Sequence, residues 1–161
     1  MRAFFLISTV LTCIFSASAA QLEGRVVKVS DGDTITVLDS SKTQHRIRLT
    51  GIDAPEKKQA FGEKSRLSLA ALVAGKNVTV HWDNKDRYNR ILGKVITPDG
   101  KDANLLQIKN GMAWHYKQYS KTRPFNETSL YSSAEDKAKK DRIGLWVDKN
   151  PVAPWDWRKN K

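Results

Sequence analysis

Apolar and polar residues alternate along five short segments of the chain, which is the pattern of β-strands with one buried face. In the second segment Ile35 and Val37 share one face, while Thr34 and Thr36 share the other. The five predicted strands are residues 22–29, 33–39, 44–52, 77–83 and 90–98. The pair Asp31-Gly32 between the first two predicts a tight hairpin connection.

Three further segments repeat their apolar residues at the spacing of a helix. Leu69, Leu72 and Val73 form an i, i+3, i+4 stripe, and Gly75 is a typical residue just beyond a helix end. The predicted helices are residues 57–76, 104–111 and 126–142. We expect the tail from Asp148 onward to pack on the body of the protein, because it carries two tryptophans, Trp155 and Trp157.

The order of these elements predicts an α+β protein that is mainly a β-barrel. Five strands, with a helix after the third and two helices after the fifth, suit a small closed barrel of the oligonucleotide/oligosaccharide-binding (OB) type with about three α-helices. Such barrels bind single-stranded polyanions across their strands. The absence of internal repeats and of a low-complexity linker favours one domain, residues 21–161.

The first 20 residues have the features of a secretory signal peptide. Arg2 precedes an apolar run of about ten residues, and the small residues Ala17-Ser18-Ala19-Ala20 follow. A membrane span needs ~20 apolar residues, so an anchor is disfavoured. Lipidation of Cys13 is also disfavoured, because the residue before it is the comparatively large Thr12. We therefore expect export to the periplasm or the cell exterior.

Cysteine and histidine usage limits the kinds of metal site. Cys13 is the only cysteine, so the domain has no disulfide and no thiolate zinc site. The three histidines, His45, His81 and His115, show no metal-ligand spacing. Any bound metal is therefore expected to be a hard cation with oxygen ligands.

The domain is strongly basic. The chain has 28 basic and 17 acidic residues, and removal of Arg2 with the signal peptide leaves 27 basic residues and a net charge of +10. Such a charge favours a polyanionic partner, which can be nucleic acid, anionic lipid or acidic polysaccharide. Charge that serves solubility alone remains an alternative at this point.

Carboxylates and arginines gather at the predicted strand ends. Asp33 opens the second strand, while Asp53 and Glu56 follow the third, so Asp33 and Asp53 would meet at one rim if these strands pair. Two such carboxylates with a backbone carbonyl would suit Ca²⁺. Arg48 and Arg90 would add guanidinium groups that bind phosphate oxygens. Separate, solvated turn residues are the other interpretation of the same spacing.

The motifs VSDGDTI (29–35), IRLTGIDAPE (47–56) and DRYNRILGKV (86–95), followed by NGMAWHY (110–116) and RIGLW (142–146), resemble the thermonuclease family. These are the secreted nucleases of the staphylococcal type. The order and spacing of the motifs match over roughly residues 22 to 158. A lone DGDT is a weak signal, whereas the ordered set is specific.

The resemblance implies a calcium site made by Asp33, Asp53 and the backbone carbonyl of Ala54. The best-known family member has threonine at the last position, and Ala54 keeps the carbonyl while losing only a hydroxyl. It further implies that Glu56 is the general base and that Arg48 and Arg90 bind the phosphate. The residues implied to contact the rest of the nucleotide are Arg87, Tyr88, Tyr116 and Tyr119.

The resemblance thus implies a secreted Ca²⁺-dependent endonuclease, expected to act as a monomer. It would hydrolyse DNA and RNA, preferably single-stranded, on the 5′-oxygen side of the phosphate and leave 3′-phosphate ends. A non-catalytic nucleic-acid-binding barrel is the alternative, although the chain retains the full catalytic set. A protein for membranes or polysaccharides would explain the charge but not the motifs.

Overall fold

The computed structural model describes residues 20–118 and 125–160 and contains a closed five-stranded barrel. Its strands are β1 (Ala20–Asp31), β2 (Thr34–Leu38), β3 (Gln44–Leu49), β5 (Asn77–Lys85) and β6 (Ile91–Ile96). They close in the order β1-β2-β3-β6-β5, and only the β3–β6 pairing is parallel. The predicted barrel is confirmed. The predicted signal peptide, residues 1–20, lies outside the described residues apart from Ala20.

The interior of the barrel is built from alternate residues of its strands. Ile35, Val37, Ile47, Val80 and Val95 are all fully buried. Because successive side chains of a strand point to opposite faces, their neighbours face outward. The alternation read from the sequence therefore identified the face that lines the barrel, although Thr34 and Thr36 on the outer face of β2 are buried as well.

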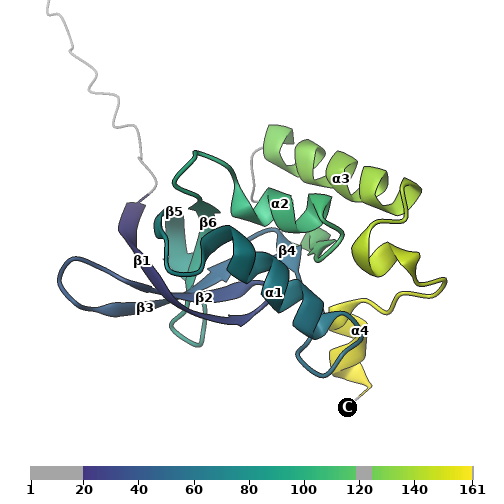
Figure 1. Ribbon diagram of the computed structural model, residues 1–161, viewed down its shortest axis with the longest axis horizontal. Coiled ribbons are helices and arrows are strands. Elements are labelled where there is room, and N and C mark those ends of the chain that lie inside the picture. Colours follow the sequence, from purple (N-terminus) through teal and green to yellow (C-terminus); the bar gives the residue numbers. More distant parts are fainter. Residues whose placement is uncertain (1–19, 119–124, 161) are drawn as a thin grey trace, which may run out of the picture.

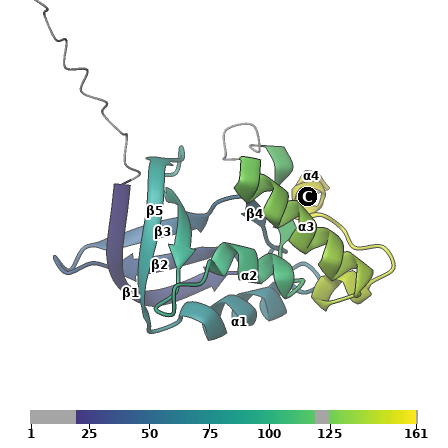
Figure 2. The same cartoon turned by 90° about the horizontal axis from the view of Figure 1, so that it is seen from above.

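Helices cover one side of the barrel, as Figure 1 shows. They are α1 (Gly62–Val73), α2 (Ala103–Lys109), α3 (Phe125–Lys140), the 3₁₀ helix η2 (Gly144–Val147) and α4 (Pro154–Lys159). The strands lie to one side of the molecule in both views, with α3 and α4 toward the other (Figure 2). No helix within the described ranges has the length and apolar character needed to cross a membrane.

The structure differs from the prediction in the helical content of two segments. The helix predicted at residues 57–76 begins only at Gly62, because the chain first turns back on Glu56 through the bonds Gln59 N to Glu56 O and Gly62 N to Gln59 O. Phe61 closes this turn with a left-handed φ of 66°. The tail, predicted only to pack on the body, contains the short helix α4, with Pro154 in its first turn.

The strand predicted at residues 44–52 is broken by a corner. β3 ends at Leu49, and a two-residue strand, β4 (Ile52–Asp53), continues in a separate sheet with β7 (Trp114–His115). Gly51 makes the corner with a φ of 73°, a conformation that favours glycine. The corner places Asp53 opposite Trp114 instead of along the barrel wall.

A buried asparagine on α2 fixes this corner. The side chain of Asn104 is fully buried, and its Nδ2 donates to Thr50 O at 2.9 Å and to Gly93 O at 3.2 Å. Its Oδ1 accepts from Val95 N at 3.1 Å. The corner thus rests on a satisfied hydrogen-bond network and is held to strand β6.

A second buried amide fixes the turn between β1 and β2. Gln107 Nε2 donates to Gly32 O at 2.8 Å and to Ser65 O at 3.1 Å. A Cβ on Gly32 would lie 1.8 Å from Ser65 Oγ and 2.7 Å from the Ala54 side chain, so only glycine fits there. This close approach fixes the turn and with it the position of Asp33, the residue after Gly32.

Candidate active site

Asp33 and Asp53 converge on one guanidinium group, as the strand pairing predicts. Arg48 on β3 lies 3.2 Å from Asp33 (Nη1 to Oδ2) and 2.8 Å from Asp53 (Nη2 to Oδ1). Both carboxylates are buried, with Asp33 6% and Asp53 1% exposed. The interpretation of these acids as separate, solvated turn residues is therefore wrong.

The corner itself anchors the Arg48 side chain. Arg48 Nη1 donates to Leu49 O at 2.9 Å and to Ile52 O at 3.0 Å, in addition to its carboxylate contacts. Five N–H donors in a rigid fork allow one guanidinium to make all these contacts at once. Arg48 therefore joins the end of β3, the corner and both aspartates.

The backbone of Ala54 also contacts one of the two aspartates. Ala54 N donates to Asp33 Oδ2 at 2.7 Å, across 21 residues of sequence. Among the described residues no three His, Cys, Asp or Glu side chains are grouped so that they could hold a metal. The carboxylates of Asp33 and Asp53 and the backbone carbonyl of Ala54 would nevertheless supply only oxygen ligands, which are the ligands that Ca²⁺ prefers.

Glu56 belongs to the same cluster through an arginine that the sequence interpretation missed. Arg158 on α4 donates to Glu56 Oε1 (Nη1, 2.8 Å) and to Asp53 Oδ2 (Nη2, 2.8 Å). Glu56 is held from its own side as well, since its N donates to Gln59 Oε1 at 3.0 Å. Asp33, Asp53 and Glu56 are thus linked by two guanidinium groups, from Arg48 and Arg158.

Burial dominates the electrostatics of the acid cluster. Burial raises the pKa of Asp53 above its ordinary value, and Asp33 adds to this increase, although hydrogen bonding to Arg158 and the charge of Arg48 oppose it. Burial also raises the pKa of Asp31 to about 6, with the charge of Asp33 as the next cause. Burial is therefore the main factor that opposes ionisation of Asp53 and Asp31, and at Asp53 the two arginines offset it only in part.

Arg90 directly precedes β6, the strand that pairs with β3, and its side chain bonds outside the acid cluster. The parallel pairing of Ile47 with Ile91, both of them buried in the barrel, puts Arg48 and Arg90 on the outer face of adjacent strands. Arg90 Nε pairs with Asp86 Oδ2 at 2.7 Å. A phosphate group that contacted both arginines would therefore have to approach from outside the barrel.

The turn from Asp86 to Arg90 presents the predicted nucleotide-contacting pair. Asp86 organises the turn by accepting from Tyr88 N and Arg90 N. Arg87 lies over the ring of Tyr88, with 4.8 Å between the guanidinium carbon and the ring centroid, and Tyr88 is 62% exposed. Both side chains are therefore accessible to a nucleic-acid strand that lies over this face.

A pocket of about 360 Å³ lies beside the acid cluster, on the α4 side. Its walls include the aromatic residues Trp114, Tyr116 and Trp155 and the lysines Lys117, Lys139 and Lys159. Trp155 lies 5.6 Å from both Trp114 and Tyr116 between ring centroids. The pocket adjoins the site, because Trp114 pairs with Asp53 and Lys159 follows Arg158.

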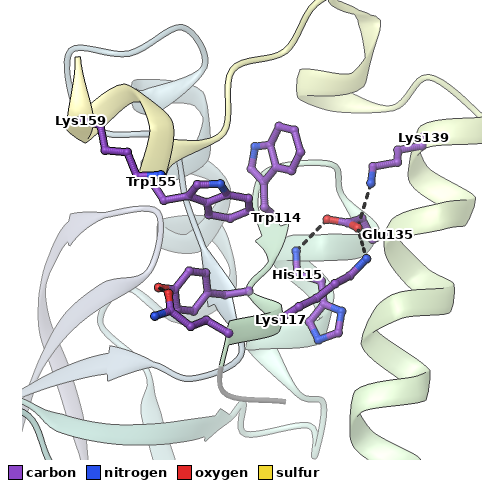
Figure 3. A pocket seen from close by; sticks show the side chains of 9 residues that line it. Trp114, His115, Lys117, Glu135, Lys139, Trp155 and Lys159 are labelled. Carbon is purple, nitrogen blue, oxygen red and sulfur yellow. Dashed lines mark hydrogen bonds and ion pairs between the residues drawn. The ribbon is translucent and has the colours of Figure 1, made fainter. Parts of the chain in front are cut away.

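A buried glutamate fixes the floor of this pocket. Glu135 Oε2 lies 2.9 Å from Lys139 Nζ and 3.5 Å from Lys117 Nζ, and Glu135 Oε1 accepts from His115 N. Figure 3 shows Glu135 between the two lysines. Glu135 is 2% exposed and lies on α3. Tyr119, the other tyrosine predicted to contact the nucleotide, lies outside the described residues.

Two site residues, Arg158 and Asp31, were absent from the sequence prediction. Arg158 lies more than a hundred residues from its partners, so no local spacing could connect them; the tryptophan-rich tail was the only signal that this segment packs. Asp31 was read as part of a hairpin turn. Its proximity to Asp33 is visible in the sequence, but its partial burial is not.

Comparisons with known proteins agree with the motifs. A model of the family described as staphylococcal nuclease homologue matches residues 46–148. The chain is 48% identical over 142 residues to a protein named as an uncharacterized endonuclease of Escherichia coli, covering 88% of each chain. It is 43% identical over 152 residues to a similarly named protein of Haemophilus influenzae, covering 94% of this chain and 82% of the other. It is also 40% identical over 148 residues to a micrococcal nuclease of Shigella flexneri, covering 87% and 82%.

Proposed function

The chain belongs to the staphylococcal nuclease homologue family, and from this premise we propose that it is a Ca²⁺-dependent endonuclease. It hydrolyses phosphodiester bonds of DNA and RNA on the 5′-oxygen side and leaves 3′-phosphate ends. Similar proteins carry the names endonuclease and micrococcal nuclease, which supports the reaction class.

The observation that carries the proposal is the ion-pair network at the barrel rim. Asp33 from the β1–β2 turn, Asp53 from β4 and Glu56 from the loop after β4 meet around the guanidinium groups of Arg48 and Arg158. Buried carboxylates are costly unless positive groups or a metal pair with them, and such clusters of acids are typical of functional sites. A barrel that only bound nucleic acid would need basic and aromatic residues, not this group of buried acids.

In the proposed reaction Asp33, Asp53 and the Ala54 carbonyl hold the cation. A bound Ca²⁺ supplies Lewis-acid activation of the phosphate. Glu56 accepts a proton from the attacking water, whose oxygen forms a bond to phosphorus while the bond to the 5′ oxygen breaks. The 5′ oxygen takes up a proton from solvent and leaves as a 5′-hydroxyl. Arg48 and Arg90 donate to the phosphate oxygens and stabilise the extra negative charge of the transition state.

The substrate is proposed to be a single strand that lies across the outer face of β3 and β6. Arg87 and Tyr88 contact it on one side of the acid cluster, and Tyr116 in the α4-side pocket contacts it on the other. Unpaired bases can stack on exposed aromatic rings, whereas paired bases cannot reach them. Since water is the nucleophile, a 2′-hydroxyl is not required, and DNA and RNA are both substrates.

We further propose that residues 1–20 direct export and are removed after Ala20, so that a monomer of residues 21–161 acts outside the cytoplasm. N-terminal sequencing of the exported protein would identify Gln21 as the first residue under this proposal. A protein that keeps residues 1–20, or remains inside the cell, would contradict it.

The experiment that tests the proposed reaction is cleavage of a labelled single-stranded DNA by purified residues 21–161, with Ca²⁺ or with EGTA. We expect cleavage only with Ca²⁺, and fragments whose 3′ ends accept a polymerase only after phosphatase treatment. Equal cleavage in EGTA would contradict the cation requirement, and 3′-hydroxyl ends would contradict the position of the broken bond.

A further inference from the structure

The guanidinium of Arg158 occupies the carboxylate oxygens that a cation would use. Arg158 Nη2 lies 2.8 Å from Asp53 Oδ2, and Nη1 lies 3.3 Å from Asp53 Oδ1 and 2.8 Å from Glu56 Oε1. We propose that Arg158 competes with the divalent cation for Asp53 and thereby sets the cation affinity of the site. This inference rests on the proposed function for the assignment of Asp53 as a Ca²⁺ ligand.

Both oxygens of Asp53 are already engaged by positive groups. Arg48 Nη2 bonds Oδ1 at 2.8 Å, while Arg158 bonds Oδ2 and also approaches Oδ1. A divalent cation at these oxygens would face one or two guanidinium groups at contact distance, and such like charges repel strongly in a buried site. At least one arginine must therefore withdraw when a cation binds Asp53.

Arg158 is the arginine that can withdraw at lower cost. The Arg48 side chain is 17% exposed and is also bonded to the carbonyls of Leu49 and Ile52, so its withdrawal would break these bonds as well. The Arg158 side chain is 44% exposed and lies on a six-residue helix near the chain end. Its guanidinium can move into water without leaving a buried charge unpaired.

The position of Arg158 is set by specific packing of the tail. Gln59 Nε2 donates to Val152 O at 2.6 Å, and Trp155 packs edge-on against Trp114. Trp157 lines a second pocket that includes Pro55 and Gln59. The packing of the tail therefore places Arg158 at the acid cluster. Arg158 lies beyond the part of the chain that matches the family model, which ends at residue 148.

Displacement of Arg158 would also change Glu56. The same guanidinium holds both Asp53 and Glu56, so a cation that takes Asp53 removes two of the three hydrogen bonds that keep Arg158 in place. Once Arg158 leaves, the Glu56 carboxylate is open to water. Cation binding and the availability of the general base are coupled in this way through one side chain.

The test measures Ca²⁺ binding directly, by isothermal titration calorimetry of residues 21–161 without nucleic acid. We expect Arg158→Ala to lower the dissociation constant for Ca²⁺ about tenfold or more, because it removes charge-assisted hydrogen bonds that compete with the metal. Arg158→Lys keeps the charge but cannot fork between two carboxylates, so its affinity should lie between those of wild type and Arg158→Ala.

Lys159→Ala is the matched control. It removes one positive charge from the same helix, and Lys159 pairs with Asp156 and not with the acid cluster. The Lys159 side chain is 74% exposed, and solvent and salt screen such a surface charge, so Lys159→Ala should bind Ca²⁺ like wild type. Circular dichroism of each variant shows whether it is folded before binding is compared.

Hydrogen exchange of the amides of α4 provides a readout that is independent of affinity. In wild type Ca²⁺ should increase exchange at the amides of Trp155–Lys159, because the Arg158 contacts are lost. In Arg158→Ala exchange should already be high and should not respond to Ca²⁺. Tighter binding by Arg158→Ala together with this pattern supports the proposal.

Two results would overturn it, and they are distinguishable from failure of the proposed function. Ca²⁺ binding to Arg158→Ala no tighter than to Lys159→Ala would show that Arg158 does not compete for the cation. Wild-type α4 that is unaffected by bound Ca²⁺ would show that Arg158 is not displaced. Absence of Ca²⁺ binding to every form would instead overturn the cation assignment on which the proposed function depends.

Discussion

Arg48 reaches Asp53 across the corner between β3 and β4, with 2.8 Å between Nη2 and Oδ1, and the same guanidinium bonds the carbonyls of the corner. One side chain therefore both shapes the corner and holds a carboxylate of the site. A residue proposed to bind phosphate is at the same time part of the local fold, which has consequences for how its variants behave.

Arg48→Lys should lower both stability and activity. Lysine keeps the charge but cannot contact Asp53 and the carbonyls of Leu49 and Ile52 together. We expect a loss of about 1–3 kcal/mol in the free energy of unfolding, from buried hydrogen bonds left unmade. Urea denaturation measures this loss. An unchanged unfolding free energy would show that the corner does not depend on the guanidinium fork.

Arg90→Ala should lower kcat by about a hundredfold or more, since it removes a group that donates to the transition state. Its main partner is Asp86 in an exposed turn, so the melting temperature should change little. Arg87→Ala is the control from the same turn and should raise KM more than it lowers kcat. If Arg90→Ala retains near-normal kcat, the proposed role of Arg90 in the transition state is wrong.

Trp155→Ala should weaken binding of single-stranded DNA roughly fivefold to a hundredfold, because stacking on one aromatic ring contributes about 1–3 kcal/mol per base. Trp155 lines the pocket beside Tyr116, while Trp157 on the same helix lines the pocket on the other side. Trp157→Ala is therefore the control for loss of an indole from α4. Binding is measured in EGTA with a fluorescent oligonucleotide, and equal losses in both variants would exclude a specific stacking role.

Asp31 should give the protein a pH-dependent stability. Its pKa is raised from 3.8 to about 6, so the folded protein binds this proton more tightly than the unfolded chain. The resulting stabilisation is fully present below pH 3.8 and is lost as the pH rises through about 6. Asp31→Asn should therefore flatten the dependence of the melting temperature on pH over this window, measured in EGTA.

Asp99→Asn is the control for that measurement. Hydrogen bonding to Lys101 and Thr97 lowers the pKa of the exposed Asp99 carboxyl to about 2, below the window in which Asp31 titrates. The slope of the Asp99→Asn protein between pH 4 and 6 should equal that of wild type. An identical slope in wild type and Asp31→Asn would show that Asp31 is not shifted.

Much of the barrel and most of the acid cluster could be predicted from the sequence. Alternation with a period of two identified the strands, and pairing of the second with the third implied that Asp33 and Asp53 would meet. The break at Gly51 could not be predicted in the same way. Residues 44–52 read as one continuous strand, and the corner is fixed by Asn104 on a distant helix.

The contribution of the tail was beyond the reach of local patterns. Arg158 meets Asp53 and Glu56 only because Trp155 and Trp157 pack α4 against the body, a tertiary relationship that no spacing encodes. Gln107 likewise resembles an ordinary surface residue of a short helix, yet it is fully buried against Gly32. Long-range contacts of polar side chains thus completed a site whose core was visible in the motifs.

The most direct test of the proposed function is the single-turnover rate of DNA cleavage by Glu56→Gln at saturating Ca²⁺. We expect the rate to fall by about 10²–10⁴ relative to wild type, because the amide cannot accept the proton of the attacking water. Glu63→Gln, which alters an exposed glutamate paired with Arg66 on α1, should leave the rate unchanged. A Glu56→Gln rate within a few-fold of wild type, in a folded protein that binds Ca²⁺ and DNA normally, would contradict the proposal that Glu56 is the general base of a nuclease.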